Sequence, residues 1–329
     1  MTGKERMCFA LRREKITGHV PHFELVFFLT MEAFGKVHPS HRHYEQWNQM
    51  SAKEKMLHLN DMADCYILMA ETYHHDAIFV HPNPGTPDMV KALLEIIRER
   101  TGDKYFVMMH GDTTHSIPDG EHMMDFAVQM YEEPEKLHEQ SKRWMDNAFR
   151  NAERLTGSGL LDGYALCSDY AFNVNPFFTK DQFAEFIFPY LKETINEYRR
   201  MGFFTIKHSD GNIMPILDQI VDAGPDAIHS IDPQGGMNLA LVRKLYGDRV
   251  ATIGNVNCGL LQTGTQDEAD ADVRRCLHEG MDDGKYGFIF STSNCVYTGL
   301  DLERYQRMVD IWQEEGVYEK REQIILNKR

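Results

Sequence analysis

Side chains that can bind a metal ion follow several short apolar runs of the sequence. His208 and Asp210 come at the end of the run 203–208, and because side chains two residues apart in an extended chain point the same way, both can reach one ion. Asp232 and Cys295 follow two later runs of the same kind. Imidazole, carboxylate and thiolate are all zinc ligands, and a mixed set suits a catalytic site with an exchangeable position. The pattern therefore predicts a metal site at the ends of these runs.

Each of these residues also has an ordinary structural interpretation. His208 could instead be a hydrogen-bonding or general-acid histidine, and Asp210 could be a turn carboxylate. Cys258 and Cys295 could be small buried thiols, since free cysteine is often fully buried. His229 lies before the end of its run, so we expect it to face the surrounding helices.

The apolar runs are rich in Phe, Val, Ile and Tyr, and several lack polar alternation, as buried parallel strands do. We expect eight strands, at 22–28, 76–80, 105–110, 163–168, 203–208, 226–231, 250–255 and 287–291. Helices should fill the gaps. Capping boxes at Thr2, Ser51 and Thr179 and a proline at Pro87 mark four helix starts, and one long helix is expected over 180–202.

Eight strands that each precede a helix predict an α/β protein, a closed (β/α)8 TIM barrel that forms a single domain over 1–329. We expect a helical extension before the first strand. The segment 30–49 after it is either a surface excursion or a loop long enough to act as a lid. An open doubly wound sheet is the alternative fold, but no GxGxxG phosphate loop follows the first strand. Residues 320–329 are expected to form a frayed, solvated end.

Composition narrows the classes of partner and the compartment. The chain has 50 acidic and 35 basic residues, a formal net charge of −15. Such a chain repels phosphate backbones and anionic lipids, so we expect neither a nucleic acid nor a membrane as partner. No apolar run approaches the roughly 20 residues that span a bilayer, and the charged segment 1–15 lacks the apolar centre of a signal peptide. We therefore expect a cytoplasmic protein whose cysteines are free thiols.

Three blocks follow one another in an order typical of one known family: His-Ser-Asp-Gly-Asn at 208–212, Gly-Asn-Val-Asn-Cys at 254–258 and Leu-Leu-Gln-Thr-Gly-Thr at 260–265. With these blocks, the sequence resembles the uroporphyrinogen decarboxylase-like superfamily over nearly its full length. The resemblance implies a (β/α)8 barrel and one of two chemistries. These are cofactor-free decarboxylation of uroporphyrinogen, or methyl transfer that involves corrinoid proteins or thiols and usually zinc.

The segment after the first predicted strand separates these two branches. True decarboxylases of the superfamily carry an arginine-rich motif there, which grips the propionate groups of the substrate. This chain instead has PHFELVFFLTMEAFGK, which contains no arginine. The corrinoid-dependent zinc methyltransferase branch therefore looks closer.

The resemblance to that branch also implies metal ligands. Zinc methyltransferases of this fold place His-x-Cys after the fifth strand and a further Cys after the eighth. His208 matches the histidine, Asp210 stands where the first cysteine would be, and Cys295 matches the last. Asp232 falls near the position of an additional carboxylate in some members. A second possible ligand set is Asp232, Cys258 and Cys295.

These observations predict an O-demethylase component, a methyltransferase that moves a methyl group from an aryl methyl ether to the Co(I) corrinoid of a partner protein. A ligand set with more carboxylate makes a harder Lewis acid, which suits an ether oxygen. A phenolate leaves more readily than an alkoxide because the pKa of phenol is about 10. Glu24, His110 or Asp169 would orient or protonate that oxygen. Aromatic residues would pack against the ring. The candidates are Phe27, Phe28, Tyr170, Phe172, Phe177 and Tyr297.

Two other functions remain open. A metal-independent decarboxylase acting on a smaller acid would use His208 and Asp210 as acid and carboxylate rather than as ligands. A barrel without enzymatic activity would only dock a corrinoid protein. Relatives in the superfamily are often monomers or homodimers, so the resemblance implies one of these states.

Overall fold

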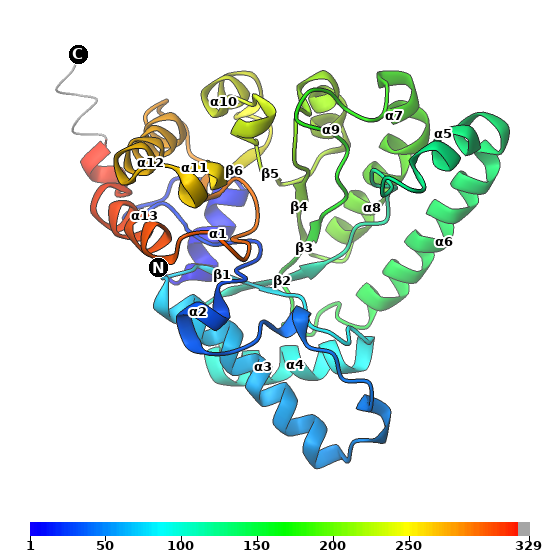
Figure 1. The fold of residues 1–329 in the computed structure, drawn as a ribbon, viewed down its shortest axis with the longest axis horizontal. Coiled ribbons are helices and arrows are strands. Elements are labelled where there is room, and N and C mark those ends of the chain that lie inside the picture. Colours follow the sequence, from blue (N-terminus) through cyan, green and yellow to red (C-terminus); the bar gives the residue numbers. More distant parts are fainter. Residues whose placement is uncertain (322–329) are drawn as a thin grey trace.

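The computed structural model describes residues 1–321, and Figure 1 shows them as a curved sheet with helices around it. Seven parallel strands pair in the order of the chain. They are β1 (Ala77–Val80), β2 (Phe106–His110), β3 (Gly163–Leu166), β4 (Phe204–His208), β5 (Ala227–His229), β6 (Ala251–Val256) and β7 (Phe288–Thr292). Each lies within two residues of a predicted strand, so seven of the eight predicted strands are confirmed. The fold is an α/β fold that resembles a TIM barrel.

The remaining predicted strand, the first in the sequence at 22–28, does not form a continuous ladder. It makes two isolated bridges, His22 to Phe290 of β7 and Phe27 to Val296, which follows β7. The backbone N–H of Thr292, which lies between those bridges, donates to the carboxylate of Glu24 instead of to a main-chain carbonyl. A side chain therefore takes the place of the ladder, and this is why the segment is not a strand.

The same segment still occupies the gap between the first and last strands. The backbone N–H of Phe23 donates to Phe290 of β7, and the carbonyl of His22 accepts from Asp76, just before β1. Residues 22–28 therefore lie where a closing strand would lie, although they pair only at single points.

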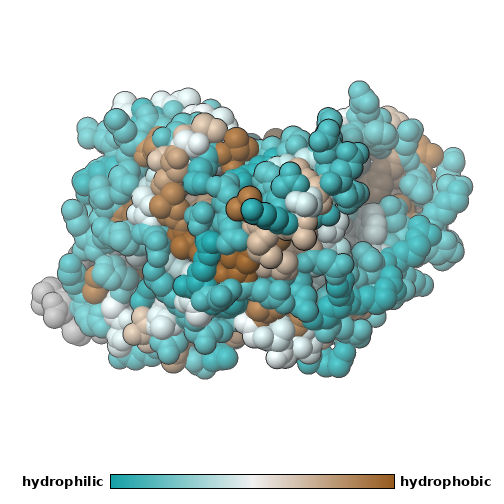
Figure 2. All heavy atoms as spheres, turned by 90° about the horizontal axis from the view of Figure 1, so that it is seen from below, coloured by the Kyte–Doolittle hydropathy of each residue, from teal (hydrophilic) through white to brown (hydrophobic). Residues whose placement is uncertain are grey.

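Helices surround the sheet. They are α1 (Gly3–Leu11), α2 (Thr30–Phe34), α3 (Ala52–Thr72), α4 (Pro87–Thr101), α5 (Met123–Glu132), α6 (Pro134–Glu153), α7 (Lys180–Phe186), α8 (Phe188–Arg200), α9 (Leu217–Ala223), α10 (Leu239–Tyr246), α11 (Cys258–Thr263), α12 (Gln266–Met281) and α13 (Leu302–Glu315). The capping boxes at Thr2, Ser51 and Thr179 are all present. In the described part of the chain, no helix has the length and apolar character needed to cross a membrane. Figure 2 shows, from below the view of Figure 1, a mainly hydrophilic face with scattered apolar patches.

The helix expected over 180–202 is two helices. α7 ends at Phe186 and α8 begins at Phe188, with Ile187 between them. Pro189 has no backbone N–H to donate to the carbonyl of Glu185, so the hydrogen-bond ladder breaks at this point.

The segment 30–49 is more ordered than a plain loop. It contains α2 and two short 3-10 turns, Pro39–His41 and Trp47–Gln49. Asp61 of α3 holds it in place, because its carboxylate accepts from both Lys36 and Arg42 at 2.5 Å. Movement of this segment as a lid stays a prediction.

A buried ion pair joins the carboxyl ends of β2, β3 and β4. Lys207 is 1% exposed, and its Nζ donates to the Asp112 carboxylate at 2.8 Å and to the carbonyls of Leu166 and Ser168. Asp112 also accepts from the backbone N–H of Ser168 at 2.9 Å and from Thr114. Burial alone would raise the pKa of Asp112, but the charge of Lys207 and these hydrogen bonds hold it below its usual value.

Asp112→Asn should destabilise the protein strongly, because it leaves a buried ammonium group without a counter-charge. We expect the free energy of unfolding, measured by urea denaturation, to fall by about 3–5 kcal/mol. Asp119→Asn is the matched control, since Asp119 is an exposed carboxylate whose ion pair is with nearby His122, and it should have no measurable effect. Equal stability of the two variants would show that the buried pair does not hold the strand ends together.

Candidate metal centre

Three side chains from neighbouring strand ends converge in the barrel mouth. Asp169 follows β3, His208 ends β4, and Asp210 comes two residues later. One oxygen or nitrogen atom from each lies within 4.8 Å of the other two. The Nε2 atom of His208 is 3.7 Å from Oδ1 of Asp169 and 3.7 Å from Oδ1 of Asp210. The predicted proximity of His208 and Asp210 is therefore present, and Asp169, predicted to act on the substrate, lies beside them.

The chemistry of this cluster fits a cation. Oδ1 of Asp210 is buried and has no hydrogen-bond partner among residues 1–321, an arrangement that costs free energy unless something compensates the charge. Its Oδ2 accepts from Asn294 at 2.5 Å, and Asp169 accepts from the backbone N–H of Asp210 at 3.0 Å. Burial raises the pKa of Asp210 to about 6; His208 opposes the rise, whereas Asp169 and Asp232 add to it. A bound divalent ion would relieve this excess of negative charge.

His229 lies directly behind His208. Its Nδ1 is 2.7 Å from Nδ1 of His208, and its Nε2 is 3.2 Å from the carbonyl oxygen of Thr292. Thr292 belongs to β7, which does not pair with β5, so the ring crosses the interior of the barrel. The expectation that His229 faces the helices was wrong. It assumed a strand as far as residue 231, whereas β5 ends at His229 itself.

The other predicted ligands lie near this cluster but outside it. The carboxylate of Asp232 is engaged by the backbone, because it accepts hydrogen bonds from the N–H groups of Gln234 at 2.9 Å and Gly211 at 3.3 Å. Cys258 is fully buried at the start of α11, with its Sγ 4.0 Å from the carbonyl of Cys295. Burial raises the pKa of the Cys295 thiol to about 11, and nearby carboxylates contribute. Within the described residues, Asp232, Cys258 and Cys295 do not form a three-ligand group of their own.

The sequence analysis missed one residue of the site and misplaced another. Asn294 orients Asp210, and its only signal was its position beside Cys295 at the end of a predicted strand. His229 was noticed but was placed on the wrong side of its strand.

Glu24 is buried beside β7, and its carboxyl group has a raised pKa. Burial raises its pKa to about 7, against hydrogen bonds from Thr292 and Ser291. Oγ1 of Thr292 lies 2.5 Å from Glu24 and 2.6 Å from the carbonyl of Asn294. The same carboxyl oxygen of Glu24 also accepts from the hydroxyl of Ser291 and from the backbone N–H of Thr292, so Glu24 is fixed in place by hydrogen bonds from β7.

His110, at the end of β2, is accessible to solvent, with the ring of His81 at 4.9 Å. Partial removal of water and the neighbouring His81 lower the pKa of His110 to about 4. At neutral pH it is therefore a neutral imidazole rather than an acid.

The six predicted aromatic residues divide into two groups. Phe27 packs against Tyr73 and Tyr305, and Tyr170 lies under the Nζ of Lys207, 4.0 Å from the ring centre. Both are buried in the core, out of reach of a substrate in this structure. The partly or fully exposed aromatic residues are Phe28, Phe172, Phe177 and Tyr297.

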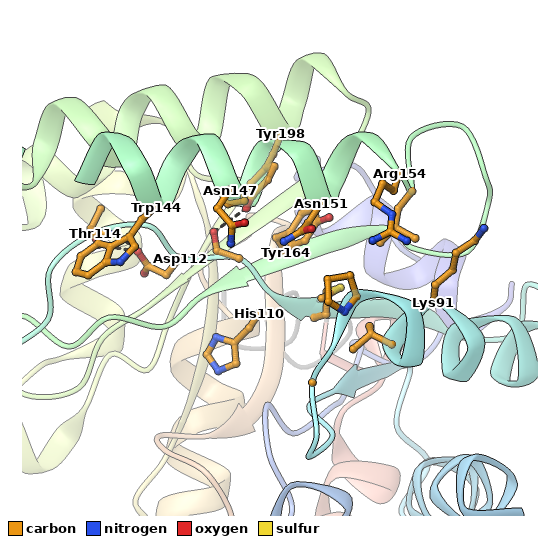
Figure 3. A pocket seen from close by; sticks show the side chains of 17 residues that line it. Lys91, His110, Asp112, Thr114, Trp144, Asn147, Asn151, Arg154, Tyr164 and Tyr198 are labelled. Carbon is orange, nitrogen blue, oxygen red and sulfur yellow. Dashed lines mark hydrogen bonds between the residues drawn. The ribbon is translucent and has the colours of Figure 1, made fainter. Parts of the chain in front are cut away.

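A cavity of about 460 Å³ opens on the outside of β2 and β3, between α4 and α6. Figure 3 shows Asn147 and Asn151 extending from α6 into it, where Tyr164 and Tyr198 also line the cavity, while His110 is turned away from that helix. The metal cluster does not line this cavity. The cavity is therefore separate from the metal cluster, although His110 lines the cavity.

Comparisons with known proteins agree with this architecture. The family described as "Uroporphyrinogen decarboxylase (URO-D)" matches residues 112–315. A methyltransferase from Methanosarcina mazei has a similar structure, with a TM-score of 0.72 and 17% identity over 95% of this chain and 99% of that chain. A GH5_18 protein from Bifidobacterium longum subsp. infantis has a TM-score of 0.52 and 11% identity over 92% of this chain and 80% of that one. Curated protein sequences give no match. At these identities the solved structures show a shared fold alone.

Zinc titration of the purified protein, followed by calorimetry and elemental analysis, will test the ligands. We expect a single site per chain, and Asp210→Asn should weaken affinity by more than roughly 100-fold, beyond the effect of losing a group that only supports a ligand. Cys258→Ser is the control and should bind zinc normally. The opposite pattern, with binding lost in Cys258→Ser and kept in Asp210→Asn, would assign the site to the cysteine set.

Glu24 should make stability fall as the pH rises. The folded protein keeps this proton up to a pKa of about 7, whereas an unfolded chain loses it near 4.5. The penalty therefore builds up between these values and reaches about 3 kcal/mol above them. Urea unfolding of metal-free protein at several pH values should show this loss relative to Glu24→Gln, and parallel pH profiles would mean that Glu24 is ionised when folded.

Proposed function

Because the chain belongs to the uroporphyrinogen decarboxylase (URO-D) family, we propose that it is a metal-assisted methyltransferase of that family. Its substrate would be an aryl methyl ether, and the acceptor would be the Co(I) corrinoid of a separate protein. The observation that carries this proposal is the convergence of Asp169, His208 and Asp210, where one buried oxygen of Asp210 has no hydrogen-bond partner in the described part of the chain. The shared fold of the methyltransferase from Methanosarcina mazei supports methyl transfer.

The composition of the cluster supports an oxygen-bound methyl group. Two carboxylates and one imidazole make a hard ligand set, which suits oxygen better than sulfur. Zinc bound by Asp169, His208 and Asp210 would supply Lewis-acid polarisation of the ether oxygen. An aryl ether is the better substrate because phenolate, with the pKa of phenol about 10, leaves more readily than an alkoxide.

The reaction requires a proton from the protein or from water. The bond between methyl carbon and ether oxygen breaks with its electron pair on oxygen, while the two electrons of Co(I) form the new bond to carbon. The phenolate that leaves then takes up one proton. Glu24, with a pKa of about 7, holds a proton at pH values up to about 7, whereas His110, with a pKa of about 4, has lost its proton well below that pH. Of these two residues, Glu24 is therefore the better source; because it is buried, its proton would reach the phenolate only through intervening groups.

The remaining predicted residues have supporting roles. His110 can form a hydrogen bond to the methyl donor as a neutral imidazole, and Asp169 serves as a metal ligand. Of the exposed aromatic residues, Phe28 stacks on His41 with ring centres 4.3 Å apart, and Phe172 lies in the loop after β3. These rings can flank a planar substrate at the mouth.

The test is methyl transfer to free cob(I)alamin or to a corrinoid protein, followed by the absorbance change of the cobalt, with a panel of methoxybenzoates and methoxyphenols. Asp210→Asn should lower kcat/KM by roughly 100-fold or more, since polarisation by a metal contributes several kcal/mol. Cys258→Ser should keep wild-type activity. No methyl transfer from any methoxyarene to active, zinc-loaded protein would contradict the proposal.

Decarboxylation without a metal is the competing function. The same panel contains carboxylates, so release of CO₂ can be followed in parallel on chelator-treated protein. Decarboxylation at full rate without metal would replace our proposal by the lyase.

A further inference from the structure

His208 of the metal cluster and His229 behind it share one hydrogen bond. Nδ1 of His208 and Nδ1 of His229 are 2.7 Å apart. A hydrogen bond between two ring nitrogens needs an N–H on one and a lone pair on the other. The distance alone does not decide which ring donates.

The contact between His229 and Thr292 decides which ring donates. Nε2 of His229 faces the carbonyl oxygen of Thr292 at 3.2 Å, and a carbonyl can only accept. The N–H of a neutral His229 is therefore on Nε2, and its Nδ1 carries the lone pair. His208 must then donate from Nδ1. Its Nε2 is left as the atom that faces Asp169 and Asp210.

The surroundings keep this arrangement in place. His229 is fully buried, so water is not available as a replacement partner. The carbonyl it faces belongs to Thr292 in β7, whose N–H and hydroxyl are engaged by Glu24. The Thr292 carbonyl is thus fixed, and it orients both rings in series.

We propose that His229 is a positioning residue that holds His208 in the tautomer protonated at Nδ1 and thereby aims the Nε2 lone pair at the metal. This inference rests on the metal centre of the proposed function. Ligating histidines in proteins depend on such a partner on the second ring nitrogen, which sets both tautomer and ring orientation. Here the partner is another histidine, anchored to the carbonyl of Thr292 in β7, beyond the neighbouring strand β6.

The decisive measurement is the tautomer of His208, read from nitrogen chemical shifts and two-bond couplings in protein labelled with ¹⁵N-histidine and freed of metal. In the wild type, His208 should be protonated at Nδ1. In His229→Phe, which fills a similar volume without an acceptor, this preference should disappear. A bare Nδ1 on His208 in the wild type would overturn the proposal, even if the Phe variant fails to fold.

Zinc affinity is the second readout. His229→Phe should weaken binding by roughly 10–100-fold, and His229→Asn, which keeps an acceptor near the position of Nδ1, should recover part of that loss. His115→Phe is the matched control, because His115 is also buried and contacts a carbonyl, that of Leu137, at 3.2 Å. Unchanged affinity in His229→Phe would overturn the proposal.

The tautomer measurement and the zinc titration together distinguish a failure of this inference from a failure of the proposed function. If the wild type binds no zinc, the metal-assisted function fails, while the tautomer measurement on metal-free protein still tests the role of His229. If zinc binds but no methyl group is transferred, the positioning role stands without the proposed reaction.

Discussion

The buried ion pair of Lys207 and Asp112 is the interaction on which the site depends. It binds the carboxyl ends of β2, β3 and β4 to one another through Nζ of Lys207, the Asp112 carboxylate and the backbone of Ser168. Two metal-site residues come directly after members of this network, since Asp169 follows Ser168 and His208 follows Lys207. A buried charge pair adds little net stability compared with apolar packing, but it is costly to break and has one favourable geometry. That geometry brings Asp169 and His208 to the same point.

A second network holds the cluster from the opposite wall. Glu24, Thr292 and Asn294 are linked by short hydrogen bonds, and Asn294 donates to Asp210. The same Thr292 accepts from His229. The segment 22–28 therefore lacks a regular hydrogen-bond ladder, and the carboxyl group of Glu24 is buried in the barrel wall at this point. The lack of a regular strand at 22–28 and the placement of the site therefore involve the same residue, Glu24.

The sequence was sufficient for most of the fold because buried parallel strands appear as uninterrupted apolar runs. It failed at 22–28, where a side chain competes with the backbone for one N–H, and over 180–202, where the effect of Pro189 was overlooked. At the site, the spacing of His208 and Asp210 was enough to predict their proximity. Spacing does not measure the distance between different strand ends, so Asp169 was expected near the substrate and Asp232, Cys258 and Cys295 near the metal.

The resemblance places a cysteine where this cluster has Asp210. This difference has a further consequence for the proposed chemistry. Two carboxylates and a neutral imidazole carry two negative charges, which balance a divalent ion. Because such a centre is neutral overall, net charge does little to stabilise the negative oxygen of the phenolate, so stabilisation of the leaving group depends on protonation. Burial supplies that proton by raising the pKa of Glu24 to about 7, at the far end of the hydrogen-bond chain that also orients Asp210. A carboxylate-rich site and a protonated carboxyl group nearby are therefore two parts of one electrostatic arrangement.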